Sequence, residues 1–204
     1  PTNCNMQFTP YNASVSEFQD DVDYLQSLGK KVLISIGGAN GYIDMSTTQA
    51  KNNFISSMTS IIQTYGLDGF DIDLEGGSVS LGGGDSDFKN PTTPKIVNLI
   101  AASKAILNNI GGGILSMAPE TAYVQGGLSA YGSIWGAYLP IIYGLRNELT
   151  YVHVQHYNSG GMEGLDGKNY TQGTADFQVA MAEVLLAGFP IARNPGNMFP
   201  PLRQ

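Results

Sequence analysis

The sequence predicts an α/β fold in which short strands alternate with amphipathic helices around a parallel sheet. Apolar, β-rich runs recur along the chain, and stretches with apolar residues at helical spacing separate them. Equivalent strand ends recur about every 38 to 44 residues, which is the arrangement of consecutive βα units; they fall at Ser35, Asp73, Met117 and Gln155. A closed eight-stranded barrel at that interval needs about 300 residues, and the chain has 204. The pattern therefore fits either a smaller open sheet or part of a barrel.

Five segments have the composition of strands. Two of them, 67–75 and 151–158, alternate apolar and polar residues, whereas 31–38 is a short apolar run that ends in a glycine pair. The signal in 185–192 is the weakest of the five. The predicted strands are 31–38, 67–75, 114–120, 151–158 and 185–192.

Five helices are predicted from apolar residues spaced three and four apart. Ser14 and Glu17 have the spacing of a capping box, which predicts the start of the first helix. The glycine-rich stretch 76–85 follows a strand directly, so we interpret it as a long functional loop and predict that residues 1–204 form a single domain. The predicted helices are 18–28, 54–65, 96–110, 131–145 and 177–185.

The composition excludes several classes of partner. With 42% hydrophobic residues and a formal net charge of −7, the chain has a globular composition and repels phosphate backbones, so we expect no nucleic-acid partner. No apolar run approaches the roughly 18 residues of a membrane span, and we expect no membrane association. Cys4 is the only cysteine and can form no internal disulfide. A monomer is expected.

The residues with the clearest chemistry are the acids of the second predicted strand. Side chains alternate along a strand, so Asp71, Asp73 and Glu75 point to one face while the apolar residues between them point to the other. Neighbouring acids on one face lie roughly 6.5–7 Å apart. Mutual repulsion and partial burial are expected to keep at least one of them protonated near neutral pH, and the three titrate as a coupled unit.

Such a cluster of acids has three interpretations. It could be an acid catalyst, a site for a hard cation such as Ca²⁺, or the solvated face of an edge strand. An EF-hand loop is excluded by the spacing and by the large apolar residues between the acids. The surrounding strand–helix pattern favours catalysis, because parallel α/β folds carry their chemistry at the carboxyl ends of the strands.

Four motifs occur in a fixed order along the chain. The segment 68–75, DGFDIDLE, resembles the DGxDxDxE motif of family 18 glycoside hydrolases, the chitinase family. The segment 35–38, SIGG, is similar to the SxGG motif of that family; 117–120, MAPE, is similar to the end of its fifth strand, and 155–158, QHYN, to the QxYN of its sixth. The resemblance covers roughly residues 30 to 192 and is nearest to the bacterial and plant-type single-domain enzymes.

The resemblance implies a (β/α)8 barrel that is incomplete in this chain. The four motifs correspond to strands three to six of the barrel, and 188–192 would belong to strand seven, so about five βα units are expected. Nothing in the sequence corresponds to strands one, two or eight. The family usually places a Trp on strand eight, and Trp135, the only one here, does not match it.

The resemblance also implies a mechanism, the retaining hydrolysis of β-1,4 N-acetylglucosamine linkages assisted by the N-acetyl group of the substrate. Glu75 would protonate the leaving oxygen and then activate water, and Asp73 would hold the N-acetyl group. Asp71 would share a proton with Asp73, and Tyr157 would hydrogen-bond the acetamide oxygen. The residues expected to bind substrate are Met117, Gln155, Glu120, Asn158 and Gly38.

Other residues with relevant chemistry are given a structural interpretation. Trp135, Tyr123 and Tyr138 could form a sugar-stacking platform, but aromatic residues at helical spacing are more typical of a core. His153 and His156 have no third ligand in view, so no metal site is expected, and no cofactor is implied.

Two alternative functions remain open in the sequence. One is an endo-β-N-acetylglucosaminidase acting on N-glycan cores, and the other is a non-catalytic chitin-binding lectin on the same barrel. The presence of Glu75 argues against the lectin. The expected partner is chitin or an N-acetylglucosamine oligosaccharide. The expected location is extracellular. Because residues 1–10 are polar, any signal peptide is expected upstream of this chain.

Overall fold

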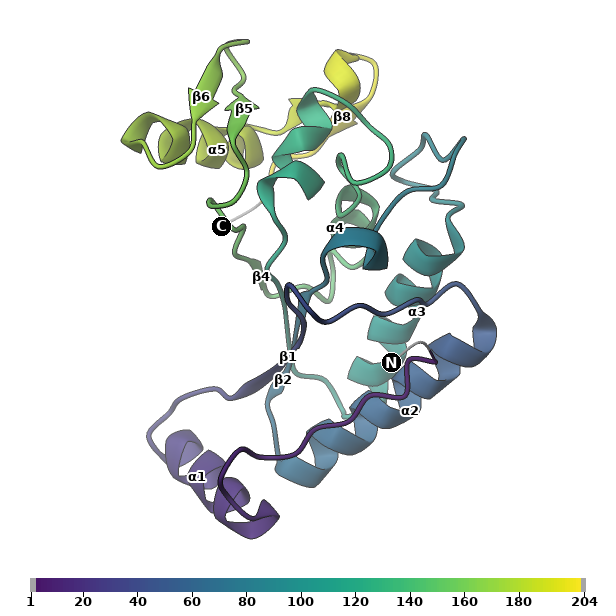
Figure 1. Ribbon diagram of the computed structural model, residues 1–204, viewed down its shortest axis with the longest axis vertical. Helices are drawn as coiled ribbons and strands as arrows, with labels where there is room; N and C mark the ends of the chain where they lie inside the picture. The colour runs from purple at the N-terminus through teal and green to yellow at the C-terminus, as the bar shows by residue number, and fades with distance from the viewer. Residues whose placement is uncertain (1–2, 203–204) are drawn as a thin grey trace.

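The computed structural model describes residues 3–202 and contains a four-stranded sheet with helices packed along it (Figure 1). The α-helices are α1 Val15–Ser27, α2 Thr48–Tyr65, α3 Pro94–Asn109, α4 Leu139–Gly144 and α5 Ala175–Ala187. The strands are β1 Leu33–Gly37, β2 Gly69–Asp73, β3 Ile114–Met117, β4 Tyr151–Val152, β5 Gly161–Glu163, β6 Asn169–Thr171, β7 Phe189–Pro190 and β8 Met198–Phe199. Short 3-10 helices lie at Gly76–Ser78, Thr121–Tyr123, Gln125–Leu128 and Ile191–Arg193.

The main sheet is parallel and runs in the order β1-β2-β3-β4. Its register aligns Asp71 with Ser35 on one side and with Ser116 on the other. Within residues 3–202, β1 and β4 each pair along one edge only, so the sheet is an open arc. The prediction of an α/β fold with a parallel, incomplete barrel is confirmed.

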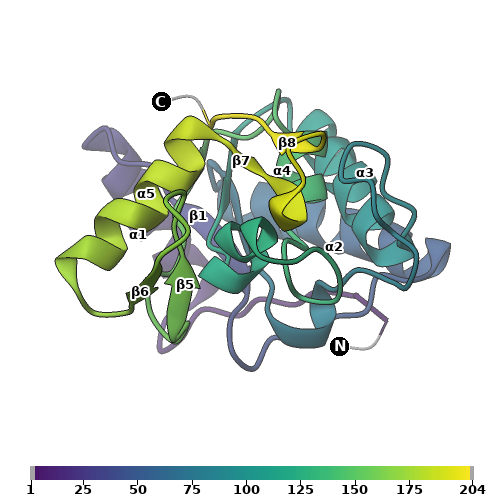
Figure 2. The same cartoon turned by 90° about the horizontal axis from the view of Figure 1, so that it is seen from above.

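Helices α1 to α4 form one continuous layer against the sheet, whereas α5 packs on β6 and on the 3-10 helix Gln125–Leu128. α1 packs on α2, α2 on α3, and α3 on α4, so consecutive crossover connections lie side by side (Figure 2). Between helices and sheet lies the hydrophobic core, which includes Phe70 and Ile72 of β2, both fully buried. None of the helices in the described part of the chain is long and apolar enough to cross a membrane.

Local sequence signals explain where the helices begin and end. The predicted capping box is present, because the Ser14 side chain accepts from Glu17 N–H and the Glu17 carboxylate accepts from Ser14 N–H. Thr47 caps α2 by accepting from Ala50 N–H, and α2 ends at Gly66, whose left-handed backbone (φ 63°) favours glycine.

The predicted helix 131–145 is wrong over its first half. Only Leu139–Gly144 forms an α-helix, and the residues before it form irregular turns. Gly132, Ser133 and Gly136 have φ values of 141°, 52° and 72°, which an α-helix does not permit. The apolar spacing in this segment therefore reflects packing of a folded loop into the core.

The predicted strand 185–192 is also corrected. α5 continues to Ala187, and the short strand β7 pairs antiparallel with β8 and does not join the parallel sheet. Gly188 ends the helix with φ 75°, and a Cβ at this position would lie 2.6 Å from the Phe199 carbonyl oxygen. The close approach of β8 therefore decides the structure of this segment.

Candidate active site

The acidic motif lies on the central strand β2 and on the residues that follow it. Asp71 is buried, whereas Asp73 and Glu75 are partly exposed. The strand ends at Asp73, two residues earlier than predicted, but Glu75 keeps an extended backbone (φ −120°, ψ 169°). The alternation of faces therefore continues beyond the sheet, and Glu75 stays on the side of Asp71 and Asp73.

The side-chain amide of Gln155 hydrogen-bonds to both Asp73 and Glu75. Gln155 Nε2 lies 2.8 Å from Asp73 Oδ1 and 3.1 Å from Glu75 Oε1, and it also donates to the Ala118 carbonyl oxygen at 2.8 Å. Gln155 is itself buried. Because one nitrogen reaches both carboxylates, Asp73 and Glu75 face the same point in space, as the strand pattern predicted.

Donors from three neighbouring segments surround the carboxylate of Asp71. Ser35 Oγ on β1 donates to Oδ2 at 2.8 Å, and Ser116 Oγ on β3 donates to Oδ1 at 2.6 Å. His153 Nε2, just after β4, lies 3.0 Å from Oδ1. A buried carboxylate must be hydrogen-bonded to be tolerated, and these three groups meet that need.

The pKa of Asp73 is raised well above its ordinary value of 3.8. Partial burial and the negative charges of Glu75 and Asp71 raise the pKa of Asp73 to about 6, against the lowering effect of the hydrogen bond from Gln155. Crowded carboxylates cannot all ionise cheaply. Asp73 is therefore protonated in a large fraction of molecules at mildly acidic pH, in line with the expected retention of a proton within the trio.

The glycine pair after β1 lets the first two strands approach closely. Gly37 is paired with Asp73, and a Cβ on Gly37 (φ 112°) would lie 2.0 Å from the Asp73 carbonyl oxygen. Gly38 N–H donates to that same oxygen at 2.6 Å, and a Cβ on Gly38 would lie 3.8 Å from Asp73 Oδ2. Gly38 therefore borders the acid group, its contact with substrate stays a prediction, and no side chain could replace Gly37 without moving β2.

Glu120 lies at the same end of the sheet. It forms an isolated parallel bridge with Gln155, and burial together with the negative charge of Glu75 raises the pKa of Glu120. A fourth carboxyl group thus borders the acids, and its contact with substrate stays a prediction.

Three of the predicted site residues lie elsewhere or make no contact with the acids. Met117 pairs with Ile72 and is fully buried in the core, because strand alternation puts it on the opposite face from Ser116. Tyr157 and Asn158 are exposed in the turn after Gln155, with Asn158 at φ 56°. Within residues 3–202 neither side chain forms a hydrogen bond to the acids.

Three residues of the site were not among the predicted ones. Ser35, Ser116 and His153 all contact Asp71, and His153 was given no role in the sequence. A signal for His153 did exist, since it lies two residues before Gln155 and alternation puts both on one face. No group of three or more His, Cys, Asp or Glu side chains that could hold a metal ion occurs among residues 3–202.

The aromatic residues considered as a platform separate into two kinds. Tyr123 and Tyr138 are buried, as expected of core residues, while Trp135 is 39% exposed. The two tyrosines therefore belong to the core, and of the three only Trp135 presents an aromatic ring to solvent.

Comparison with known proteins agrees with this geometry. The family described as Glycosyl hydrolases family 18 matches residues 2–184. Chitinase Chi52 of Paenibacillus xylanexedens is 61% identical over 97% of this chain and 38% of its own length. Chitinase D of Niallia circulans is 59% identical over 100% of this chain and 39% of its own length. The chain thus spans about two fifths of these curated relatives.

A solved structure extends the match to three dimensions. A family GH18 chitinase from Chromobacterium violaceum is 41% identical and superimposes with a TM-score of 0.89 over 100% of this chain and 53% of its own. This chain therefore aligns over its whole length with about half of that longer structure. On the family match, the shared fold and the four motifs, the chain belongs to family 18 of the glycosyl hydrolases.

Proposed function

We propose that the protein containing this chain hydrolyses β-1,4 linkages between N-acetylglucosamine units of chitin or chito-oligosaccharides, with retention and with assistance from the substrate's N-acetyl group. The observation that carries the proposal is the presentation of Asp73 and Glu75 to one point by Gln155, at the carboxyl end of a parallel sheet. The names of the two bacterial relatives, both chitinases, support chitin as the substrate.

In the proposed mechanism Glu75 protonates the glycosidic oxygen while the acetamide oxygen of the substrate attacks the anomeric carbon. The bond to the leaving sugar breaks, and a cyclic oxazolinium ion forms without a protein nucleophile. Glu75, now ionised, then takes a proton from a water molecule that opens the oxazolinium ring. Glu75 ends the cycle protonated, and the configuration at the anomeric carbon is retained.

Asp73 and Asp71 act on the positive intermediate. Asp73 holds the acetamide group and, as an anion, stabilises the oxazolinium charge in a partly buried site. The charge of Asp71 raises the pKa of Asp73, and the predicted sharing of a proton between them remains part of the proposal. Tyr157 is 55% exposed, so its hydroxyl is accessible to the acetamide of a bound sugar.

The other residues predicted to bind substrate have different proposed roles. Gln155 orients the two acids, and Glu120, Gly38 and Asn158 border the substrate. Met117 supports the site from the core side of β3, because its side chain is buried there. Since chitin is an extracellular polymer, we also propose that the protein is secreted. We further propose that it acts as a monomer.

The test of the proposed acid is Glu75→Gln in the full-length protein. Removing a general acid–base group costs roughly 10²–10⁴-fold, so turnover of a chitobiose reporter should fall by at least about 100-fold while oligosaccharide binding changes less than about twofold. Glu183→Gln, an identical change at an exposed position on α5, should leave both unchanged. Wild-type turnover in Glu75→Gln would remove the proposed acid.

The two alternative functions predict different outcomes in the same assays. An enzyme specific for N-glycan cores would cleave a glycopeptide and leave chito-oligosaccharides intact. A lectin would bind chito-oligosaccharides, and even the wild-type protein would not hydrolyse them. The relatives' names favour chitin, and the presence of Glu75 favours turnover.

A further inference from the structure

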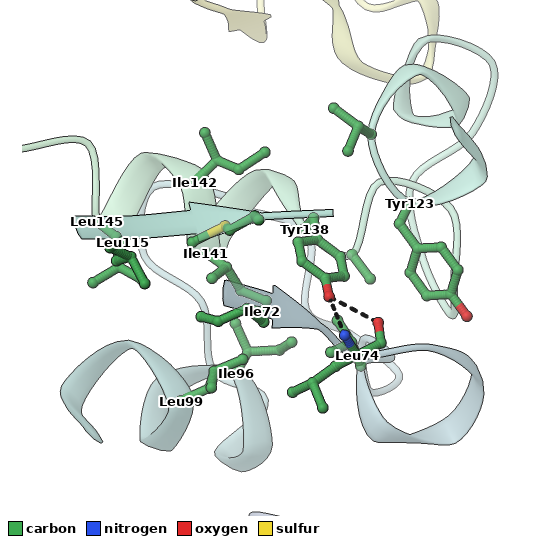
Figure 3. Packing of buried hydrophobic residues seen from close by; sticks show 14 of the residues in the cluster. Ile72, Leu74, Ile96, Leu99, Leu115, Tyr123, Tyr138, Ile141, Ile142 and Leu145 are labelled. Atoms are coloured by element: carbon green, nitrogen blue, oxygen red, sulfur yellow. Dashed lines mark hydrogen bonds between the residues drawn. The ribbon is translucent and has the colours of Figure 1, made fainter. Parts of the chain in front are cut away.

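The backbone between the two outer acids is bound by a buried tyrosine. Leu74 lies between Asp73 and Glu75, and the hydroxyl of Tyr138 donates to the Leu74 carbonyl oxygen at 2.8 Å and accepts from the Leu74 N–H at 2.8 Å. Figure 3 shows the hydroxyl pointing at both backbone groups. One side chain thus pairs with both the N–H and the C=O group of one residue's main chain.

This contact occurs where the sheet stops. Pairing of β2 with β1 ends at Asp73, and pairing with β3 ends at Ile72. The Leu74 side chain is buried, and unpaired backbone groups in such a place are costly. Tyr138 therefore takes the place that a neighbouring strand would occupy, one residue before Glu75.

A second tyrosine contacts the main chain on the other side of Glu75. The rings of Tyr123 and Tyr138 pack edge to face, with centroids 5.9 Å apart, and the Tyr123 hydroxyl donates to the Gly76 carbonyl oxygen at 3.4 Å. Tyr138 N–H also donates to the Tyr123 carbonyl oxygen. Leu74 and Gly76, the two neighbours of Glu75, each contact one member of this tyrosine pair.

The chemistry of Tyr138 suits a fixed support. Its side chain is fully buried, and burial raises the pKa of its hydroxyl well above the usual value, so the proton that Leu74 accepts stays in place across the working pH range. A tyrosine ring held by packing on all sides has little freedom to move.

We propose that Tyr138 is a positioning residue for the catalytic acid: by fixing the Leu74 main chain it sets where the carboxyl group of Glu75 meets the glycosidic oxygen. The inference rests on the proposed function of Glu75. A displacement of about 1 Å in a reacting group can cost roughly 100-fold in rate, so the loss of this support should be measurable.

The experiment compares two substrates in the full-length Tyr138→Phe variant. Chitotetraose has a poor leaving group that needs proton donation, whereas 2,4-dinitrophenyl chitobioside has a good one that needs little. A misplaced acid should lower kcat/KM on chitotetraose about 10- to 100-fold and kcat/KM on the dinitrophenyl substrate less than about threefold, because kcat/KM reports the steps up to departure of the leaving group, before Glu75 acts as a base.

Three variants make the result decisive. Tyr143→Phe is the matched control, because its hydroxyl forms no hydrogen bond within residues 3–202, and both rates should be unchanged. Tyr123→Phe should show the same preference for the good leaving group with a smaller loss. Glu75→Gln should show it most strongly, and if Glu75→Gln loses no activity the proposed function fails, whatever Tyr138→Phe does.

Equal losses on both substrates in Tyr138→Phe, or no loss on either, would overturn the positioning role, since a folding defect lowers both rates alike. If circular dichroism shows that Tyr138→Phe is unfolded, the ratio of the two rates in Tyr123→Phe decides the question. If Tyr123→Phe then loses the same fraction of activity on both substrates, the proposal is wrong.

Discussion

The two faces of strand β2 have opposite roles, because its five residues alternate between an acidic face and an apolar face. On one face Asp71 and Asp73 contact hydroxyl, imidazole and amide donors from other strands. On the other face Phe70 and Ile72 are fully buried in the core. Partial burial and the neighbouring charges of Glu75 and Asp71 raise the pKa of Asp73 to about 6. The electrostatic cost of the acidic face is therefore offset by apolar burial on the opposite face of the same strand.

The largest effect is expected on the apolar face. Phe70→Ala removes a fully buried ring, and such changes lower the free energy of unfolding by about 3–5 kcal/mol. Denaturant unfolding would measure the loss, while kcat per folded molecule should stay within about threefold. Phe70→Leu, which keeps more of the volume, should cost less than about 1.5 kcal/mol. A large drop in kcat of folded Phe70→Ala would show that the two faces do not act separately.

A smaller effect should separate two donors to the same carboxylate. Ser116 and Ser35 both hydrogen-bond Asp71, but Ser116 is 1% exposed whereas Ser35 is exposed. Hydrogen bonds to charged groups contribute about 1.5–3 kcal/mol when buried, so Ser116→Ala should lower the free energy of unfolding by that amount. Ser35→Ala should cost less than about 1 kcal/mol, because water replaces its hydroxyl. Equal losses by urea unfolding would contradict the assignment of burial.

The smallest expected effect has the opposite sign. The pKa of Asp73 is raised from 3.8 to about 6, so between these values the folded protein binds more protons than the unfolded chain, and wild-type stability falls as the pH rises. Asp73→Asn has no such titration. The variant should gain stability relative to wild type from pH 4 to pH 6 and keep a gain of about 1 kcal/mol above pH 6, since solvent screens part of the interaction.

Urea unfolding at several pH values would measure this gain, and chitobiose hydrolysis should fall in the same variant. If the free energy of unfolding of wild type and of Asp73→Asn changed with pH in parallel, the raised pKa would not belong to Asp73. Stability gained together with activity lost would instead identify Asp73 as a residue kept for function.

Local sequence patterns predicted the features that depend on local geometry. The period of two residues placed the acids of β2 on one face, and this holds at Glu75 even though the strand ends at Asp73. The capping box at Ser14 was predicted by spacing alone and is present. The predictions failed at 131–145 and 185–192, where positive φ values and pairing with β8 overrode the apolar pattern.

The contacts that complete the site could not be predicted from local patterns. His153 and Asp71 lie 82 positions apart in sequence, and Tyr138 and Leu74 lie 64 apart. A side chain's face is decided by the backbone of its own strand, which the sequence encodes over a few residues. Which donor meets which carboxylate is decided only when β1, β3 and β4 align beside β2, because hydrogen bonds need contact within about 3 Å and nothing in a local pattern fixes that distance.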